Sequence, residues 1–379
     1  MNDGLAARLD FLTWADRLKT VTRATVLMDL SRAENSAEHG WHVALWALLN
    51  GASDRAIAMI LLHDLVEIEL GDQPIHLPHD AAAPARAEAA AADRLFAMLP
   101  EGAPLAALWA ECAAGESAHA RAARRFDHSQ PLFQVLLSPT PLPDHLHILR
   151  DNLDHGRAAR LAEDWPEAVA AARALLAGQP VPGAFGARLA LMAEADRLKS
   201  VLRATPLTNN SRHENSAEHS WHLALYALVL ADQAAPGVDI GRVIRMLILH
   251  DLVEVDVGDV PIHAAGGSAH ASAARVAAEA AAADRLFGLL PPDEGRPLRA
   301  LWDEFEAAAT PDAIFAKALD RVQPVVMNLA SGGGSWRDYD VTLDQIEARV
   351  GAKVARGAPA LWAHLQGALR DFFAAGPVA

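Results

Sequence analysis

The chain repeats itself over most of its length, and this duplication limits the folds that are open to it. Four blocks return in the same order: ADRLK (15–19 and 195–199), ENSAEH (34–39 and 214–219), HDLVE (63–67 and 250–254) and AEAAAADRLF (87–96 and 278–287). The repeated unit is about 180 residues long, which is the size of a domain rather than of a solenoid repeat. We therefore predict two similar domains, at residues 1–178 and 187–379, joined by the Pro- and Gly-rich segment between them.

The local sequence predicts helices in both halves. Hydrophobic residues make up 52% of the chain, Ala is abundant and β-branched residues are sparse, which favours helices over strands. Asn35 and Glu38 have the spacing of a capping box, so we expect a helix to begin there and to carry His39 in its first turn. A second helix is expected over residues 53–70, because Gly71 follows as a stop signal. No segment shows the alternation of a strand, and the predicted fold class is all-α.

Charge and composition exclude several partners. The chain has 48 acidic and 33 basic residues and a formal charge of −15, so it would repel a nucleic acid polymer. No apolar run reaches the roughly 20 residues of a membrane span. The single cysteine, Cys112, allows neither an internal disulfide nor a cysteine zinc site, and the N-terminus does not resemble a signal peptide. We therefore expect a cytoplasmic protein without nucleic acid or membrane partners, which can still bind a small phosphorylated ligand at a local site.

The segment HDLVEIELGD at residues 63–72 carries the residues with the most chemistry. His63 and Asp64 lie within an apolar run, where buried charge is costly unless it is paired or bound to a metal. Glu67 shares their helix face, and Asp72 follows at the next turn. An imidazole beside several carboxylates is a suitable cradle for a divalent ion.

The remaining ligands must come from other helices. His39 is a candidate because it lies in the first turn of its predicted helix. The shared Gln-Pro pairs at residues 130–131 and 323–324 align Asp127 with Asp320. Each half then has the same order of candidate metal ligands: His39, His63, Asp64 and Asp127, and His219, His250, Asp251 and Asp320. The alternative is structural, with core histidines capped by aspartates. We favour metal binding because the set occurs in both halves, which differ elsewhere.

These blocks resemble those of the HD-domain metal-dependent phosphohydrolases, and most of all the small 5'-deoxynucleotidase-like HD proteins. The resemblance rests on ENSAEH, HDLVE, GDQP or GDVP, and KALDRVQP. It implies one divalent ion per half (Mn, Fe, Co, Ni, Zn or Mg) and hydrolysis of small phosphomonoesters such as nucleoside 5'-monophosphates. It also implies pairing of the two halves as an intramolecular pseudo-dimer, because the small relatives tend to form dimers.

The resemblance further implies roles for individual residues. Glu67 and Glu254 would orient or deprotonate the attacking water. Asp72 and Asp259 would protonate the leaving oxygen or hold the sugar. The basic residues that would steady the phosphate are Arg23 and Arg203. In the nucleotidases a Trp often follows this Arg, whereas this chain has Ala24 and Ala204, so nucleoside recognition is expected to differ.

Two other functions remain open at this point. One is a metal phosphodiesterase acting on cyclic or oligonucleotide substrates, although the sequence contains no additional His-Asp cluster for a second metal. The other is a nucleotide-sensing module with one catalytic and one regulatory half. It draws on the segment at residues 332–346, GGGSWRDYDVTLDQI, which we do not find after Gln130 in the first half. His42 and His222 are interpreted as packing groups, and His76 and His263 as candidates for the mouth of a pocket.

Overall fold

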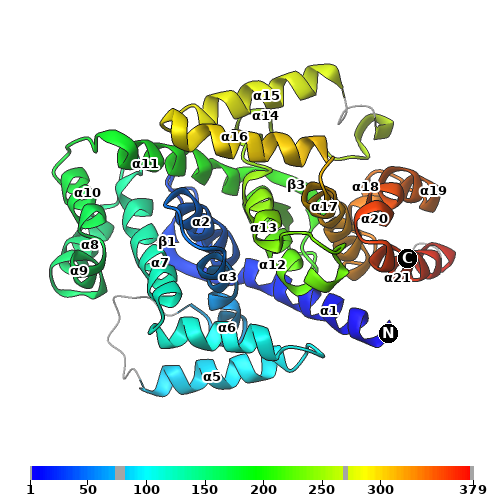
Figure 1. The fold of residues 1–379 in the computed structure, drawn as a ribbon, viewed down its shortest axis with the longest axis horizontal. Coiled ribbons are helices and arrows are strands. Elements are labelled where there is room, and N and C mark those ends of the chain that lie inside the picture. The colour runs from blue at the N-terminus through cyan, green and yellow to red at the C-terminus, as the bar shows by residue number, and fades with distance from the viewer. Residues whose placement is uncertain (1, 73–81, 268–271, 376–379) are drawn as a thin grey trace.

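The computed structural model describes residues 2–72, 82–267 and 272–375, and it confirms the all-α fold class (Figure 1). The elements of the first half are α1 (Asn2–Ala15), β1 (Thr22–Val26), β2 (Ala33–Asn35), α2 (Ser36–Leu49), α3 (Asp54–Leu62), α4 (Glu67–Leu70), α5 (Ala82–Phe96), α6 (Ala103–Ala114), α7 (Ala118–Leu136), α8 (Pro143–His155), α9 (Leu161–Asp164) and α10 (Pro166–Leu176).

The second half repeats this order with a different ending. Its elements are α11 (Gly183–Asp196), β3 (Leu202–Pro206), β4 (His213–Asn215), α12 (Ser216–Val229), α13 (Ile240–Leu249), α14 (Glu254–Val257), α15 (Ala273–Phe287), α16 (Pro292–Ala307), α17 (Pro311–Ala330), α18 (Gly334–Asp338), α19 (Leu343–Ile346), α20 (Ala352–Gly357) and α21 (Pro359–Ala374). No helix in the described part of the chain is both long and apolar enough to cross a bilayer.

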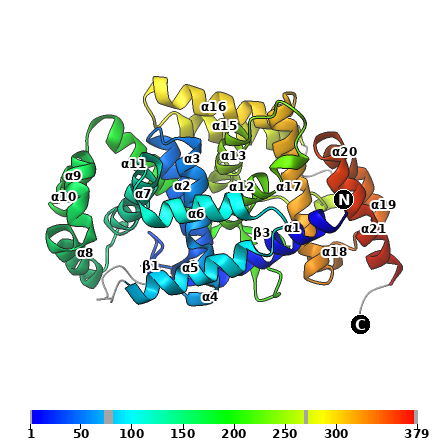
Figure 2. The same ribbon diagram turned by 60° about the horizontal axis from the view of Figure 1, so that its bottom comes forward.

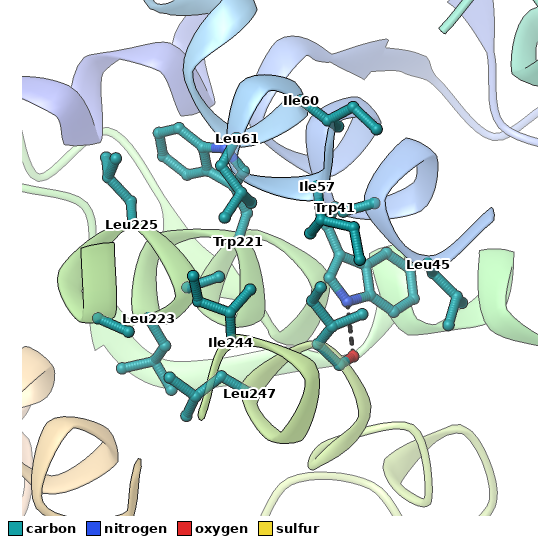
Figure 3. Close-up of a cluster of buried hydrophobic side chains, with 14 of the residues drawn as sticks. Trp41, Leu45, Ile57, Ile60, Leu61, Trp221, Leu223, Leu225, Ile244 and Leu247 are labelled. Atoms are coloured by element: carbon teal, nitrogen blue, oxygen red, sulfur yellow. Dashed lines mark hydrogen bonds between the residues drawn. The ribbon is translucent and has the colours of Figure 1, made fainter. Parts of the chain in front are cut away.

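The halves pack together through their central helices, α2 and α12, as an intramolecular pseudo-dimer. Buried side chains from α2, α3, α12 and α13 interlock between them (Figure 3). The indole nitrogen of Trp41 donates a hydrogen bond to the Ile248 carbonyl of the other half, at 3.0 Å. Gly40 lets the halves approach closely, since a Cβ there would lie 3.1 Å from the ring of Trp221. α5 with α6 and α15 with α16 lie on opposite sides of this centre (Figure 2).

The first helix of each half packs against the opposite half. α1 runs along α12 and α17, and α11 runs along α2 (Figure 1). Phe185 of α11 enters an aromatic cluster of the first half, where its ring centroid lies 5.5 to 5.8 Å from those of Trp46, Phe133 and Trp165. Each half therefore needs a helix of the other half to complete its core.

Two short antiparallel ladders correct the prediction of no strands. β1 pairs with β2, with Thr22 opposite Asn35, and β3 pairs with β4 in the same register. Each ladder consists of five residues facing three and contains an irregularity, so it is too short to show an alternating pattern. The ladder matters for the site because it holds Arg23 beside the start of α2.

The second predicted helix is also corrected, because it is interrupted at the residues with chemistry. α3 ends at Leu62, residues His63–Val66 form a 3-10 turn, and α4 continues from Glu67 until Gly71 ends it with a φ of 75°. The Nδ1 atom of His63 donates to the Ile60 carbonyl at 2.6 Å, and this side-chain bond competes with regular helix geometry. From this turn His63 faces Asp127 of α7, and Asp64 faces Arg23 of β1.

The tails of the two halves end alike, although their sequences differ. The last helices, α10 and α21, each begin at a proline, Pro166 and Pro359. The residues before them, Trp165 and Ala358, have nearly the same backbone angles, with φ of −151° and −146° and ψ of 69° and 68°. The first half thus has a counterpart of the end of the second. The difference lies in between, where α8 stands in place of α18 and α19.

Candidate functional site

In the first half, three candidate ligands converge from α2, from the turn after α3 and from α7. The capping box predicted at Asn35 is present and starts α2, so that His39 lies in its first turn. The Nε2 atom of His39 lies 3.0 Å from Oδ1 of Asp127, on α7, and Nε2 of His63 lies 3.4 Å from the same oxygen. The three ligand atoms all lie within 4.8 Å of one another, which is the geometry of a site for one cation.

The second half contains the matching arrangement in a more buried form. His219, His250 and Asp320 also bring one ligand atom each to within 4.8 Å of the others. The Nδ1 atom of His250 donates to the Leu247 carbonyl at 2.8 Å, so a neutral ring presents an unprotonated Nε2 atom. That Nε2 atom is buried and makes no hydrogen bond, which suits a metal ligand.

The predicted ligands Asp64 and Asp251 lie at the edge of these groups. Oδ1 of Asp64 is 3.0 Å from Nε2 of His63, while Oδ2 accepts a hydrogen bond from Arg23 at 3.1 Å. In the second half the corresponding distances are 3.1 Å between Asp251 and His250, and 2.8 Å between Asp251 and Arg203. Each aspartate therefore connects the histidine group to an arginine.

Arg23 contacts three predicted carboxylates of the first half. Its Nη1 atom lies 3.1 Å from Asp64, 3.6 Å from Glu67 and 3.3 Å from Asp72. Burial alone would lower the pKa of this guanidinium, but the three carboxylates outweigh burial and raise it. The Arg is therefore a fixed positive charge at the rim of the metal-ligand group.

Arg203 does the same in the second half. Its Nη1 atom lies 2.8 Å from Asp251, 3.8 Å from Glu254 and 3.4 Å from Asp259. The residues proposed from the sequence as metal ligands, phosphate-binding arginines or catalytic carboxylates thus gather in two constellations, one in each half. The structure shows the same spatial order in both: histidines and aspartate, then a bridging aspartate, then arginine with two more carboxylates.

The glutamates of these constellations have unusual protonation behaviour. Burial, followed by the charge of Asp64, raises the pKa of Glu67 to about 8, although Arg23 and Ser36 oppose the rise. The hydroxyl of Ser36 donates to Oε2 of Glu67 at 2.5 Å, and Ser216 makes the same bond to Glu254. A carboxylate with a pKa near neutrality, held by a hydroxyl, is suited to accept or donate a proton.

The carboxylates of the site also favour the binding of a cation. Burial alone would lower the pKa of His63, but Asp64 and Asp127 outweigh burial and raise it to about 10. The carboxylates thus stabilise positive charge at the imidazole, which either protons or a metal ion could provide. The imidazole and carboxylate donors fit a divalent ion.

A pocket opens beside the second constellation. It has a volume of about 250 Å³ and is lined by Leu202, Arg203, Ala204, His213, Asp259, Pro261, Asp338 and Tyr339. His263 is outside this lining, and its Nδ1 atom accepts a hydrogen bond from Arg349 at 2.8 Å. Its counterpart His76 lies outside the described residues. The pocket therefore joins the guanidinium of Arg203 to an aromatic side chain from the tail of the second half.

Sequence reasoning missed three pairs of residues around these sites: Lys19 and Lys199, Glu34 and Glu214, and Ser36 and Ser216. All lie within the repeated blocks ADRLK and ENSAEH, so the repetition itself was the signal. Glu34 and Glu214 approach Nδ1 of His39 and His219, at 3.4 and 3.0 Å. His42 and His222, interpreted as packing groups, are fully buried and contact the lysines.

Comparison with known families agrees with this geometry. The profile of the HD domain family matches residues 15–169 and again residues 195–362. The chain therefore belongs to the HD-domain family and contains two copies of the domain. The two matches together cover both constellations, including Asp127 and Asp320.

Individual relatives each match between a third and about half of the chain. A solved structure described as a predicted metal-dependent phosphohydrolase, from Magnetospirillum magnetotacticum MS-1, is 42% identical; the match covers 52% of this chain and 98% of that one, with a TM-score of 0.47. Human 5'-deoxynucleotidase HDDC2 is 28% identical over 135 residues, covering 34% of this chain and 63% of that protein. The 5'-deoxynucleotidase hdd1 of Schizosaccharomyces pombe is 24% identical over 131 residues, covering 33% and 65%. The chain thus spans less than two thirds of the length of these two curated relatives.

Proposed function

We propose that this chain is a divalent-metal-dependent phosphohydrolase that releases phosphate from small phosphomonoesters, in particular nucleoside 5'-monophosphates. One observation carries the proposal: in each half, two imidazoles and a carboxylate converge within 4.8 Å, and an arginine lies on the adjoining carboxylates. Membership of the HD-domain family and similarity to 5'-deoxynucleotidases support it.

The donors in each half suit one metal ion. His63 and His250 each use Nδ1–H to donate to a backbone carbonyl, which leaves Nε2 for the metal. His39, Asp127 and the Asp64 oxygen that faces His63 would complete the first set, and His219, Asp320 and the Asp251 oxygen that faces His250 the second. A bound divalent ion would polarise a phosphoryl oxygen and lower the pKa of a water molecule.

The other residues have complementary tasks. Arg23 and Arg203 are fixed positive charges and would hold phosphate oxygens by charge-assisted hydrogen bonds. Glu67, oriented by Ser36, would accept a proton from the attacking water, and Glu254 would do so in the second half. Asp72 and Asp259 lie 3.3 and 3.4 Å from the same arginines and would protonate the leaving oxygen.

The pocket of the second half supports a nucleoside as the leaving group. Its volume of about 250 Å³ is suited to a sugar and a base, and Arg203 and Asp259 line it together with Tyr339. Tyr339 is 39% exposed as a residue and lines the pocket, so a base can stack on its ring. Ala204, at the position where the nucleotidases often have Trp, leaves room in the same pocket.

The test combines metal analysis with a substrate panel. Metal-free protein is loaded with each divalent ion in turn and assayed for phosphate release from 5'-, 3'- and cyclic nucleotides and from oligonucleotides. We expect up to two metal ions per chain and turnover of 5'-monophosphates. Turnover of only cyclic or oligonucleotide substrates would favour a phosphodiesterase, and the absence of turnover with every ion and substrate would refute the proposal.

A further inference from the structure

A lysine of the first half lies among residues of the second half. The side chain of Lys19 has no exposed surface, and its Nζ atom lies 2.6 Å from Asp16 of its own half. It also donates to Oε2 of Glu214 at 2.5 Å and lies 3.1 Å from Nδ1 of His222, both in the second half. A buried ammonium needs such partners, because an unpaired charge in the interior is costly.

The equivalent lysine of the second half, Lys199, lies among residues of the first half. Nζ of Lys199, also without exposed surface, donates to Asp196 at 2.6 Å and to Oε1 of Glu34 at 2.7 Å. It lies 3.0 Å from Nδ1 of His42. The two contacts are related by the duplication, so each half sends one lysine into the other.

Each of these glutamates contacts a candidate metal ligand with its second oxygen. Oε1 of Glu214 lies 3.0 Å from Nδ1 of His219, whose Nε2 faces Asp320. Oε2 of Glu34 lies 3.4 Å from Nδ1 of His39, whose Nε2 faces Asp127. A chain of contacts therefore leads from the lysine of one half, through a glutamate, to a histidine of the other half's metal centre.

The charge of the glutamate determines how this series of contacts acts on the histidine. An ionised carboxylate can only accept a hydrogen bond, so it keeps the proton of His219 on Nδ1 and the lone pair on Nε2, where a metal would bind. Glu214 is fully buried, and its Oε2 lies 2.5 Å from the ammonium of Lys19, so its negative charge is paired in the interior by a side chain of the other half. Lys19 thus supplies the positive charge that holds this carboxylate beside His219.

The histidine beside the lysine does not compete for this role. Nε2 of His222 lies 2.9 Å from the Leu12 carbonyl and donates to it, so Nδ1 is an acceptor for Lys19. Asp16, Glu214 and His222 also lie within 4.8 Å of one another, like the ligands of a cation. The ammonium of Lys19 already fills this position, so the group contains a cation that the chain itself supplies.

We propose that Lys19 and Lys199 are reciprocal positioning residues: Lys19 completes the metal centre of the second half, and Lys199 completes that of the first. Neither centre is then independent of the other half. The inference rests on the proposed metal centres and adds a cross-half contribution to them.

The test isolates each centre before removing a lysine. His39→Ala leaves only the second centre, and His219→Ala leaves only the first. Lys19→Met and Lys199→Met are added to each background, and Co²⁺ affinity is measured from the visible absorption of the bound ion. With only the second centre present, we expect Lys19→Met to weaken Co²⁺ binding by about 10- to 100-fold, and Lys199→Met to have at least a several-fold smaller effect. With only the first centre present, the order is reversed.

Two controls separate positioning from a loss of folding. Arg17→Met removes an exposed positive charge close to Lys19 and should leave Co²⁺ affinity within about twofold in both backgrounds. The double variant Lys19→Met/Glu214→Gln removes both buried charges, so it should regain much of the stability against urea lost in Lys19→Met. We expect its Co²⁺ affinity at the second centre to stay low, because a neutral amide oxygen is a weaker acceptor than a carboxylate for Nδ1–H of His219.

Several outcomes would overturn the inference. Equal losses from both lysines in both backgrounds would indicate a role only in the interface, as would a Co²⁺ affinity that recovers together with stability in the double variant. If each lysine substitution weakens Co²⁺ binding only at the centre of its own half, the cross-half assignment is wrong. If the two histidine backgrounds and the unaltered chain all fail to bind Co²⁺ or any other divalent ion, the proposed metal centres are themselves wrong.

Discussion

The two halves present the same candidate ligands with different degrees of enclosure. The side chain of Asp127 is 24% exposed and that of Asp320 is 9% exposed, and His63 and His250 differ in the same direction, with 16% and 2%. The histidines lie in the repeated blocks, and Asp127 aligns with Asp320 through the shared Gln-Pro pairs, whereas the tails that follow them differ. Duplication has thus preserved the donors, while their enclosure differs between the halves.

One position in the tails packs differently in the two halves. Gly357, at the end of α20, lies so close to α17 that a Cβ there would be 2.5 Å from the Ile314 carbonyl and 2.6 Å from the Cβ of Ala318. The matching position in the first half, also two residues before the proline that starts the last helix, is Asp164, which is exposed. α20 can therefore pack tightly on the helix that carries Asp320, whereas α9 with its Asp164 cannot pack in the same way on the helix that carries Asp127.

The largest effect is expected from removing the histidines of both centres. His39→Ala/His219→Ala should bind no metal and lose activity by at least about 1,000-fold, since the ion supplies much of the charge stabilisation. Each single variant should keep one metal equivalent. Metal content by mass spectrometry and phosphate release would be measured together. If His39→Ala keeps full turnover but changes its dependence on nucleotide concentration, the first half is regulatory and the two centres differ in kind.

The arginines should show the next largest effect. In the His39→Ala background, Arg203→Ala should lower kcat/KM by about 100-fold, mainly through KM, because charge-assisted bonds to phosphate are lost. Arg23→Ala should do the same in the His219→Ala background. The lysine replacements at both positions serve as controls and should recover part of the loss. An unchanged KM would contradict the phosphate-binding role.

Acid should destabilise the metal-free protein through the buried histidines. Burial, followed by the charges of Lys199 and Lys19, lowers the pKa of His42 and of His222 to about 3. The unfolded chain binds a proton near pH 6.5, so stability is complete above that pH and falls as the pH drops toward 3. Each histidine should account for about 2 kcal/mol between pH 6.5 and 5.

Urea unfolding of metal-free protein at pH 7.5 and 5.0 measures this effect. His42→Gln and His222→Gln should each reduce the difference between the two pH values by a similar amount, because the two histidines have equivalent surroundings. If the two variants reduce the pH dependence of stability by different amounts, the surroundings of His42 and His222 are not equivalent. A pH dependence that neither variant alters would contradict the assignment.

The packing of the tail predicts a smaller effect. Gly357→Ala should move α20 away from α17 and destabilise the protein by about 1 to 3 kcal/mol, as over-packing usually does. The matched variant Asp164→Ala changes an exposed position of the first half and should stay within about 0.5 kcal/mol. Thermal unfolding measures both. If both substitutions destabilise the protein equally, tight packing at Gly357 does not distinguish the second tail from the first.

The smallest effect should be kinetic. The more exposed centre should lose its ion to a chelator a few times faster, because solvent reaches Asp127 more easily than Asp320. Stopped-flow chelation of the His219→Ala and His39→Ala variants compares the two centres directly. Faster loss from the second centre would show that enclosure by the tail does not limit exchange.

The sequence predicted the all-α fold, the duplication and the helix cap at Asn35, because these depend on residues close together in the chain. It did not predict the strands at Arg23, whose pairing spans only a few residues, nor the turn at His63, which depends on a bond to Ile60. Lys19 and Lys199 were missed for another reason. Their partners lie in the opposite half, and no local pattern indicates how two halves will pack.

The exchanged first helices have a consequence for how the protein is made. The chain emerges from the ribosome from its N-terminus, so residues 1–178 appear before α11. Phe185 and Lys199, which enter the first half, are synthesised only after that half is otherwise complete. The first half must therefore wait, partly unfinished, for the start of its neighbour. Joining both in one chain ensures that the missing helix always arrives, and at high effective concentration.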